Sequence, residues 1–285
     1  VACDSSGNTL GTPGANSGVE GESLYYKVAA FINGVETSGI VGTVGVTFTN
    51  GTATLTGDYT TTASTVTVGT AFSAALVDDY FKEVAETFTV KVDGASTYSN
   101  ASLYEKVTLD TSVVTSTVND ELLANTTAAD TVTLKVVACD INGNNIADTN
   151  SGAEGGTLYY KVVALNPAGN EITGATGTAT VSFTTGTAGS GDYSTTTTTI
   201  AVNTVFNASL TDDYLKEGNE NYTVGLSSVS AADYENPVTS SSVVTSTITS
   251  GASEGDGGTG AADTVTFKVV ACDSTGTVLS DPTAN

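Results

Sequence analysis

The stretch ALVDDYFKEVAETFTV at residues 75–90 returns as SLTDDYLKEGNENYTV at residues 209–224, and the two copies lie 134 positions apart. Most of the acids and the lysine keep their places, although many surrounding residues differ. A repeat of this length divides the chain into domain-sized copies, each long enough to bury a core of its own. We therefore expect a first repeat at residues 1–126, a second at 127–260 and the start of a third at 261–285.

The motif VACD occurs once in each copy, and in the second and third copies a strand-like TVTLKV or TVTFKV precedes it. We expect the first copy to begin inside its first strand, so that the chain is a window cut from a longer array. The alternative is that the C-terminal strand of one chain completes the first domain of the next. The single cysteines Cys3, Cys139 and Cys272 cannot form an intradomain disulfide. We expect buried apolar residues at strand ends, with a contact between chains as the alternative.

Short alternating runs bounded by Gly, Asn, Asp and Ser recur along the chain, which is the pattern of an all-β protein. In the second copy the predicted strands are 131–138, 156–165, 178–185, 195–202, 205–210, 221–228 and 242–249. Seven short strands per copy predict tandem immunoglobulin-like sandwiches in an elongated array. The many threonines suit a pleated sheet. An ice-binding or glycosylated threonine face is the minor alternative.

The charge balance excludes several functions. The chain has 31 acids against eight basic residues, all of them lysine, and it has no histidine. A net charge of -23 argues against nucleic-acid partners and anionic membrane surfaces, because both attract Lys and Arg. No run is long and apolar enough for membrane insertion in this fragment. The absence of histidine removes the usual base for a serine or cysteine nucleophile, so we expect no enzyme.

The acids are expected to converge. In an antiparallel seven-strand sandwich the loops after strands one, three and five emerge at one end, together with the tail of strand seven. In the first copy these segments carry Glu20, Asp58, Asp78, Asp79, Glu83, Glu86, Asp120 and Glu121. Such a cluster favours Ca²⁺, which takes six to eight oxygen ligands in irregular geometry. The alternative is a set of solvated acidic loops, and the recurrence of most of these acids in the second copy argues against it.

GDYT at residues 57–60, the repeated acidic loop and the closing VNDE at residues 118–121 together resemble the Calx-beta domain family. The resemblance covers most of each copy. It implies immunoglobulin-like sandwiches that bind Ca²⁺ at the end holding these loops, as in sodium/calcium exchangers and large bacterial surface proteins. Position by position, it marks as ligands Glu20, Asp58, Asp78, Asp79, Glu83, Asp120 and Glu121, with the carbonyl of Tyr80 as a further ligand.

In the second copy the resemblance marks Glu154, Asp192, Asp212, Asp213 and Glu217. There TITSGASEG replaces STVNDE, so the closing acids are lost unless Glu254 or Asp256 reaches back. We expect a weaker second site. DINGNN at residues 140–145 imitates the start of a helix-loop-helix calcium loop but lacks its Gly and final Glu, so we expect a turn.

These observations predict a calcium-stabilised structural spacer of a long, secreted cell-surface protein, such as an adhesin, a surface layer or a filament. Its partners would be neighbouring repeats and other copies in an assembly. The alternative is a calcium-sensing or directly adhesive binding module, which an exposed aromatic patch on one copy would favour.

Overall fold

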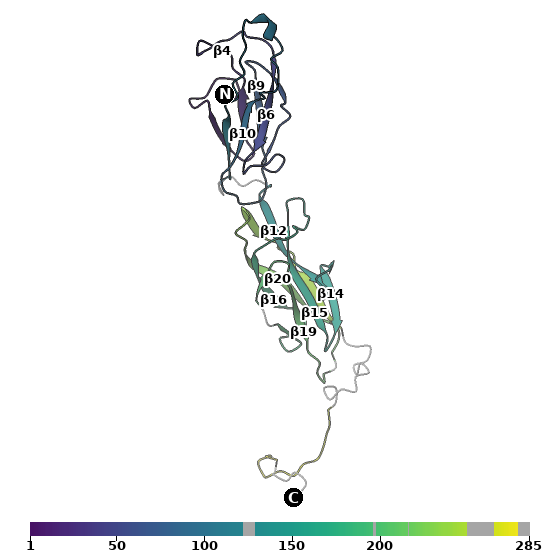
Figure 1. Ribbon diagram of the computed structural model, residues 1–285. Helices are drawn as coiled ribbons and strands as arrows, with labels where there is room; N and C mark the ends of the chain where they lie inside the picture. Colours follow the sequence, from purple (N-terminus) through teal and green to yellow (C-terminus); the bar gives the residue numbers. More distant parts are fainter. Residues whose placement is uncertain (122–128, 196–197, 216, 250–264, 279–285) are drawn as a thin grey trace. The chain divides into compact units, whose positions relative to one another are not determined.

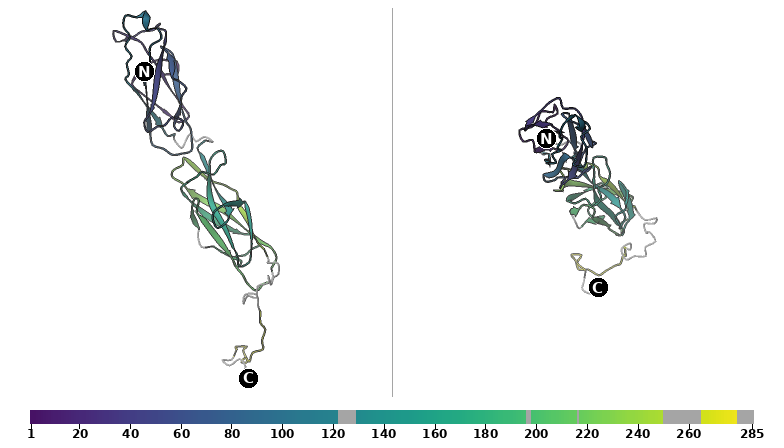
Figure 2. Two further views of the ribbon diagram at one scale, coloured as in Figure 1. Left: turned by 45° about the vertical axis from the view of Figure 1, so that its right-hand side comes forward. Right: turned by 45° about the horizontal axis from the view of Figure 1, so that its top comes forward.

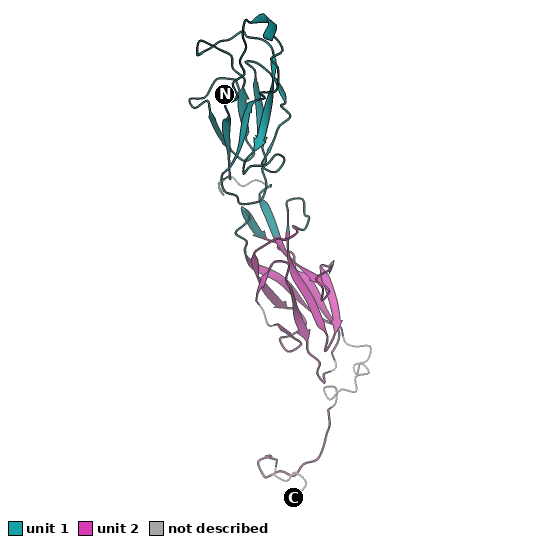
Figure 3. Ribbon diagram, in the orientation of Figure 1, with its two compact units in different colours: residues 1–133, 165–171, 230–238 teal, residues 134–164, 172–229, 239–285 magenta. Residues whose placement is uncertain are grey.

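The structure is a computed structural model that describes residues 1–121, 129–195, 198–215, 217–249 and 265–278. The chain forms two compact units (Figure 3). Unit 1 comprises residues 1–133, 165–171 and 230–238, and unit 2 comprises residues 134–164, 172–229 and 239–285. The predicted repeat boundaries, after residues 126 and 260, lie outside the described residues.

Unit 1 contains a sandwich of two β-sheets (Figure 1, Figure 2). One sheet has the strand order β1-β3-β9-β7 and the other β2-β11-β10-β6-β8, while β4 and β5 form a separate hairpin. The strands are β1 (Ala2–Cys3), β2 (Ala15–Val19), β3 (Ser23–Lys27), β4 (Phe31–Ile32), β5 (Val35–Glu36), β6 (Thr43–Asn50), β7 (Tyr59–Thr60), β8 (Thr65–Thr67), β9 (Ala71–Leu76), β10 (Glu86–Val92) and β11 (Val114–Asn119), with a 3-10 turn at Ala101–Leu103.

The later strands build the same sandwich again. Their sheets have the orders β13-β12-β15-β19-β17, with β21 against β12, and β14-β22-β20-β16-β18. The strands are β12 (Thr131–Cys139), β13 (Asn145–Ala147), β14 (Thr149–Ala153), β15 (Thr157–Leu165), β16 (Thr178–Thr185), β17 (Tyr193–Thr195), β18 (Thr199–Ala201), β19 (Val205–Leu210), β20 (Glu220–Ser230), β21 (Asn236–Thr239) and β22 (Val244–Thr249). The predicted all-β class is confirmed, and the described residues contain no α-helix.

The alternating strands bury aromatic side chains between the sheets. Tyr59 stacks on Phe88 with ring centroids 3.9 Å apart, and in the second sandwich Tyr193 stacks on Tyr222 at 4.0 Å. A buried tyrosine hydroxyl needs a partner. Tyr160 finds two, since its hydroxyl lies 2.8 Å from that of Tyr222 and 2.7 Å from Ser246 Oγ. The tyrosine of each GDY motif is thus a core residue that fixes the position of the preceding aspartate.

Two of the three cysteines behave as expected. Cys3 and Cys139 are buried at strand ends, whereas Cys272 is exposed, and all three thiols are free. Burial raises the pKa of the Cys139 thiol to about 11, so this thiol is unreactive at neutral pH. Within the described residues, no helix has the length and apolar character required to span a bilayer.

Candidate metal centre

Several strand ends meet at one end of the sandwich in unit 1. The parallel strands β2 and β11 finish together, with Val19 opposite Asn119. Strand β10 begins there too, because Glu86 pairs with Val118. Strand β2, which the sequence analysis did not predict, leaves the expected convergence intact because it runs toward the same end as β11.

Short contacts lock the acidic loops to one another. The backbone carbonyl of Asp58 accepts a hydrogen bond from the Val77 N–H at 3.0 Å, which ties the GDY turn to the DDY loop. The turn between β2 and β3 passes beside the same loop at Gly21, whose φ is 75°. A Cβ at Gly21 would lie 3.8 Å from the Cβ of Asp78. Glycine therefore allows the Glu20 turn to pack closely against the paired aspartates.

We call the carboxylates gathered here the first acidic pole. Its members are Glu20, Asp58, Asp78, Asp79, Glu83, Glu86, Asp120, Glu121, Asp130 and Glu235. Within it, three sets each bring one carboxylate oxygen per residue within 4.8 Å of the others: Glu20, Asp120 and Glu235; Asp58, Glu83 and Glu86; and Asp78, Glu121 and Asp130. Asp79 joins none of these sets, and its Oδ1 accepts the Phe81 N–H at 2.7 Å.

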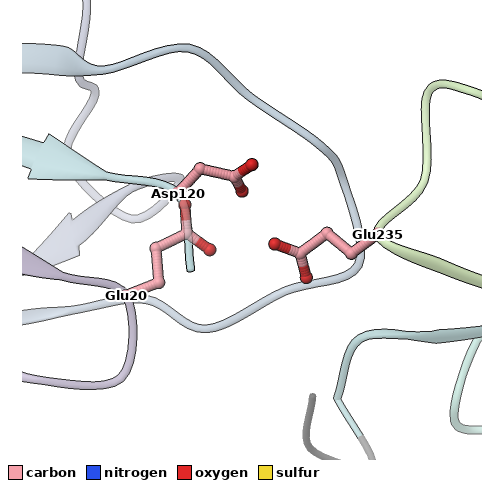
Figure 4. Close-up of side chains that lie close together, drawn as sticks. All are labelled: Glu20, Asp120 and Glu235. Carbon is pink, nitrogen blue, oxygen red and sulfur yellow. The ribbon is translucent and has the colours of Figure 1, made fainter. Parts of the chain in front are cut away.

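Several of these carboxylates are buried, and some of their oxygens accept no hydrogen bond from the protein in place of the water they have lost. Glu20 and Glu121 are 8% exposed and Glu235 is 6% exposed. In the described part of the chain, the buried oxygens without a hydrogen-bond partner include Glu20 Oε2, Asp120 Oδ1, Glu121 Oε1 and both carboxylate oxygens of Glu235. Burying an unpaired carboxylate costs several kcal/mol. Figure 4 shows Glu20, Asp120 and Glu235 with their carboxylates turned toward a common space.

The electrostatics of the metal-free pole follow from this burial. Desolvation, reinforced by Asp79, Glu83 and Asp120, raises the pKa of Glu20 to about 8. Desolvation and Asp120 raise the pKa of Glu235 to about 9. The pKa of Glu83 rises to about 7, with desolvation again as the main cause and Asp79 next. At neutral pH the pole therefore holds protons that a cation could displace.

The donor set fits Ca²⁺. It consists of carboxylates from separate loops, with buried oxygens that lack a donor, and it contains no histidine because the chain has none. Oxygen-only ligation in an irregular arrangement is the preference of Ca²⁺, whereas Zn²⁺ favours nitrogen and sulfur. Positive charge among these carboxylates would offset both their desolvation and their mutual repulsion.

The corresponding end of unit 2 is the second acidic pole, consisting of Glu154, Asp192, Asp212, Asp213, Glu217 and Glu220. Only Asp192, Glu217 and Glu220 bring oxygens within 4.8 Å of one another. None of the six residues is buried, and Asp212 is exposed. Desolvation, followed by the neighbouring Asp192, raises the pKa of Glu220.

Four residues of these sets are not among the ligands expected from the sequence. Glu235 has no acidic counterpart 134 residues earlier, where Ala101 stands, so the repeat gave no signal. Asp130 directly precedes the predicted strand 131–138, and AAD precedes the strand-like run in both the second and third copies, which is the signal that could have found it. Glu86 and Glu220 recur between copies but were left out of the expected ligands. The two acids proposed to reach back, Glu254 and Asp256, lie outside the described residues.

The DINGNN segment forms the predicted turn. Asp140 Oδ1 accepts the N–H of Asn142 at 2.8 Å and of Asn144 at 3.0 Å, and its Oδ2 accepts the Asn144 side-chain amide at 2.8 Å. Both oxygens of this carboxylate are thus occupied by local donors, which hold its pKa below the usual range. The segment is a turn closed by its own first side chain.

No family model and no curated protein matches the chain. Similar solved structures include the calcium binding domain CBD12 of CALX1.1, at 14% identity over 83% of this chain and 97% of that chain, with a TM-score of 0.32. Domains 4 and 5 of the S-layer protein SbsC are 10% identical over 80% of each chain, with a TM-score of 0.26. The Escherichia coli adhesin FdeC is 15% identical over 88% of this chain and 66% of that chain, with a TM-score of 0.28. TM-scores this low carry no argument about function, and membership of the Calx-beta family stays a prediction from the sequence.

Proposed function

We propose that the chain is a non-catalytic, calcium-stabilised segment of repeats that acts as a spacer in a long extracellular cell-surface protein. The observation that carries the proposal is the first acidic pole, where buried carboxylate oxygens face one another without donors. A protein that folds around such a cluster gains most when a cation fills it. The cation then contributes to folding as a ligand that binds only the native state.

The three sets of the first acidic pole suit more than one Ca²⁺ ion. Glu20 from the β2-β3 turn and Asp120 from the end of β11 belong to one set, whereas Asp58 from the GDY turn belongs to a second set with Glu83 and Glu86. Each set has members from different loops, so an ion bound in either set would cross-link loops of both sheets. The role of calcium would then be structural: it would make the fold more rigid and would take part in no reaction.

The alternative, a directly adhesive module, is favoured by the β4-β5 hairpin. Phe31, Ile32 and Val35 are 55%, 53% and 67% exposed there. Exposed apolar side chains of this kind mark binding surfaces when they form large patches. Three side chains on a two-residue strand pair make a small patch, so the spacer remains the preferred proposal.

Calorimetric titration of the chelator-treated chain with Ca²⁺ tests the proposal, with Mg²⁺ as the comparison ion. We expect saturable Ca²⁺ binding and much weaker Mg²⁺ binding, because Mg²⁺ demands a compact octahedral site. Calcium should also raise the unfolding temperature. Absence of binding, together with an unchanged unfolding temperature, would refute the proposal.

A further inference from the structure

Unit 1 includes a short segment, residues 230–238, that comes from within the predicted second repeat. Its Tyr234 is buried against the acidic loop of the first repeat. The ring centroid of Tyr234 lies 6.2 Å from that of Tyr80 and 5.9 Å from that of Phe81. Tyr80 and Phe81 are themselves 4.6 Å apart, so the three rings form one cluster.

Backbone contacts fix the register of the two segments. Phe81 and Tyr234 form an antiparallel β-bridge. The Lys82 N–H donates to the carbonyl of Asp233 at 3.0 Å, and the Glu235 N–H donates to the carbonyl of Tyr80 at 3.3 Å. Residues 80–82 thereby pair with residues 233–235, and the side chain of Glu235 receives a defined position beside the DDY loop.

The carboxylate of Glu235 occupies that position without a partner. The residue is 94% buried, since only 6% of it is exposed, and neither oxygen has a hydrogen-bond donor in the described part of the chain. Figure 4 shows it pointing toward Glu20 and Asp120. One carboxylate oxygen from each of the three residues lies within 4.8 Å of those of the other two. A buried acceptor surrounded by acceptors calls for a positively charged ligand.

We propose that Glu235 is a ligand of the divalent cation bound by Glu20 and Asp120, and that the bridge between residues 80–82 and 233–235 is what delivers it. The inference rests on the proposed calcium function and deepens it. Glu235 would complete the coordination of the ion, although it lies more than 100 positions away in the sequence from Glu20 and Asp120. Binding and bridge formation are then linked, because each stabilises the other by the same free energy.

The test compares Glu235→Gln with Glu105→Gln in the full chain. Both substitutions replace one carboxyl group of unit 1 by an amide, but Glu105 is exposed and belongs to none of the three sets. Calorimetric Ca²⁺ titration should show one site weakened by about 10-fold or more in Glu235→Gln, as is typical when a group that supports a metal is lost. The control should bind like the natural chain. Glu235→Asp keeps the charge but shortens the reach, and it should give an intermediate affinity.

A second readout follows the bridge itself. Calcium should slow backbone hydrogen exchange in peptides covering residues 80–82 and 233–235 of the natural chain and of Glu105→Gln, but much less in Glu235→Gln. If the natural chain binds no Ca²⁺, the proposed function fails. If it binds Ca²⁺ and Glu235→Gln matches the control in both affinity and exchange, only the assignment of Glu235 is overturned. Failure of Glu235→Gln to fold in chelator would also contradict it, because Gln has nearly the same size as Glu and cannot repel Glu20 and Asp120, so it should not destabilise the metal-free form.

Discussion

The two acidic poles contain the same repeated loop, but their carboxylates differ in burial. In the first pole Glu20 and Glu121 are buried, and three sets of carboxylates lie in contact range. In the second pole no carboxylate is buried, and a single set remains. The repeated DDY loop is therefore not sufficient for a buried site. Burial of the first pole depends on residues outside the loop.

The closing acids make much of the difference. In the first repeat β11 ends at Asn119, and Asp120 and Glu121 follow immediately, each contributing to a different set. In the second repeat β22 ends at Thr249, and the sequence continues as SGA. Like charges brought together without water favour whatever neutralises them. We therefore expect the first pole to respond to Ca²⁺ far more than the second.

The largest effect should come from replacing Asp78 and Asp79 together by Asn. Both side chains lie in the loop after β9 and outside the core, so the sandwich should stay folded. At a Ca²⁺ concentration of 100 times Kd, the variant should lose about 2.7 kcal/mol of stabilisation for each site abolished. Chemical unfolding with and without Ca²⁺ measures this loss. A calcium response equal to that of the natural chain would remove the first pole from the account.

The next effect concerns pH in the presence of chelator. The folded-state pKa is about 8 for Glu20 and about 7 for Glu83 and Glu121, against an ordinary value of 4.5. A raised folded pKa means that the folded state binds more protons than the unfolded chain between these values. Glu235, with a folded-state pKa of about 9, extends this range, so the free energy of unfolding of unit 1 should fall as pH rises from about 4.5 to about 9.

Unfolding by denaturant at a series of pH values, without metal, checks this slope. Saturating Ca²⁺ should flatten or reverse it, because the ion displaces the same protons. The second pole serves as an internal comparison, since none of its six carboxylates is buried. An equal pH slope in both units would show that the difference in burial has no electrostatic consequence.

Adding the missing acids to the second repeat should narrow the difference between the poles. Thr249→Asn, Ser250→Asp and Gly251→Glu together recreate the NDE of residues 119–121. Asn is compatible with the first position, because Asn119 Nδ2 donates to the Gly18 carbonyl much as Thr249 Oγ1 donates to that of Gly152. If the resulting Kd is a tenth of the free Ca²⁺ concentration, the gain is about 1.4 kcal/mol. No gain in calcium response would show that the closing acids are not the limiting feature.

The smallest effect is expected for Asp212→Asn combined with Asp213→Asn. Asp212 is exposed and joins no set, and Asp213 Oδ1 accepts the Leu215 N–H at 2.6 Å. Stability with Ca²⁺ should change by no more than about 0.5 kcal/mol, as for ordinary surface substitutions. If this variant lost as much calcium-dependent stability as the Asp78 and Asp79 variant, the proposed difference between the two poles would be wrong. The same double substitution is thus the matched control for the Asp78 and Asp79 variant.

Strands with an alternating apolar face were predictable from the sequence. The predicted 205–210 coincides with β19, and 131–138 differs from β12 by one residue. Strand β14 was missed because TNSGA has no apolar alternation, and its parallel pairing with β22 supplies its structure. Of the predicted strand at 195–202, β18 covers Thr199–Ala201. Residues 196–197 lie outside the described residues.

Some residues of the candidate site were likewise predictable from the sequence, and others were not. Acids that recur in the loops between strands, such as Asp58 and Glu83, could be placed at one end of the sandwich from strand order alone. Glu235 could not, because its position depends on the packing of Tyr234 against Tyr80 and Phe81. Local patterns report which face or end a residue occupies. Contacts between distant segments require the folded chain.

The most direct test of the central claim is hydrogen exchange of the full chain in saturating Ca²⁺ and in chelator, comparing β10 with β20. These strands are equivalent in the two sandwiches and begin at Glu86 and Glu220, next to the two poles. With Ca²⁺ at 100 times Kd, exchange of the β10 amides through unfolding should slow by about 100-fold for each ion bound in the first pole. The β20 amides should change much less. Equal changes in both strands, or no change in β10, would contradict the account.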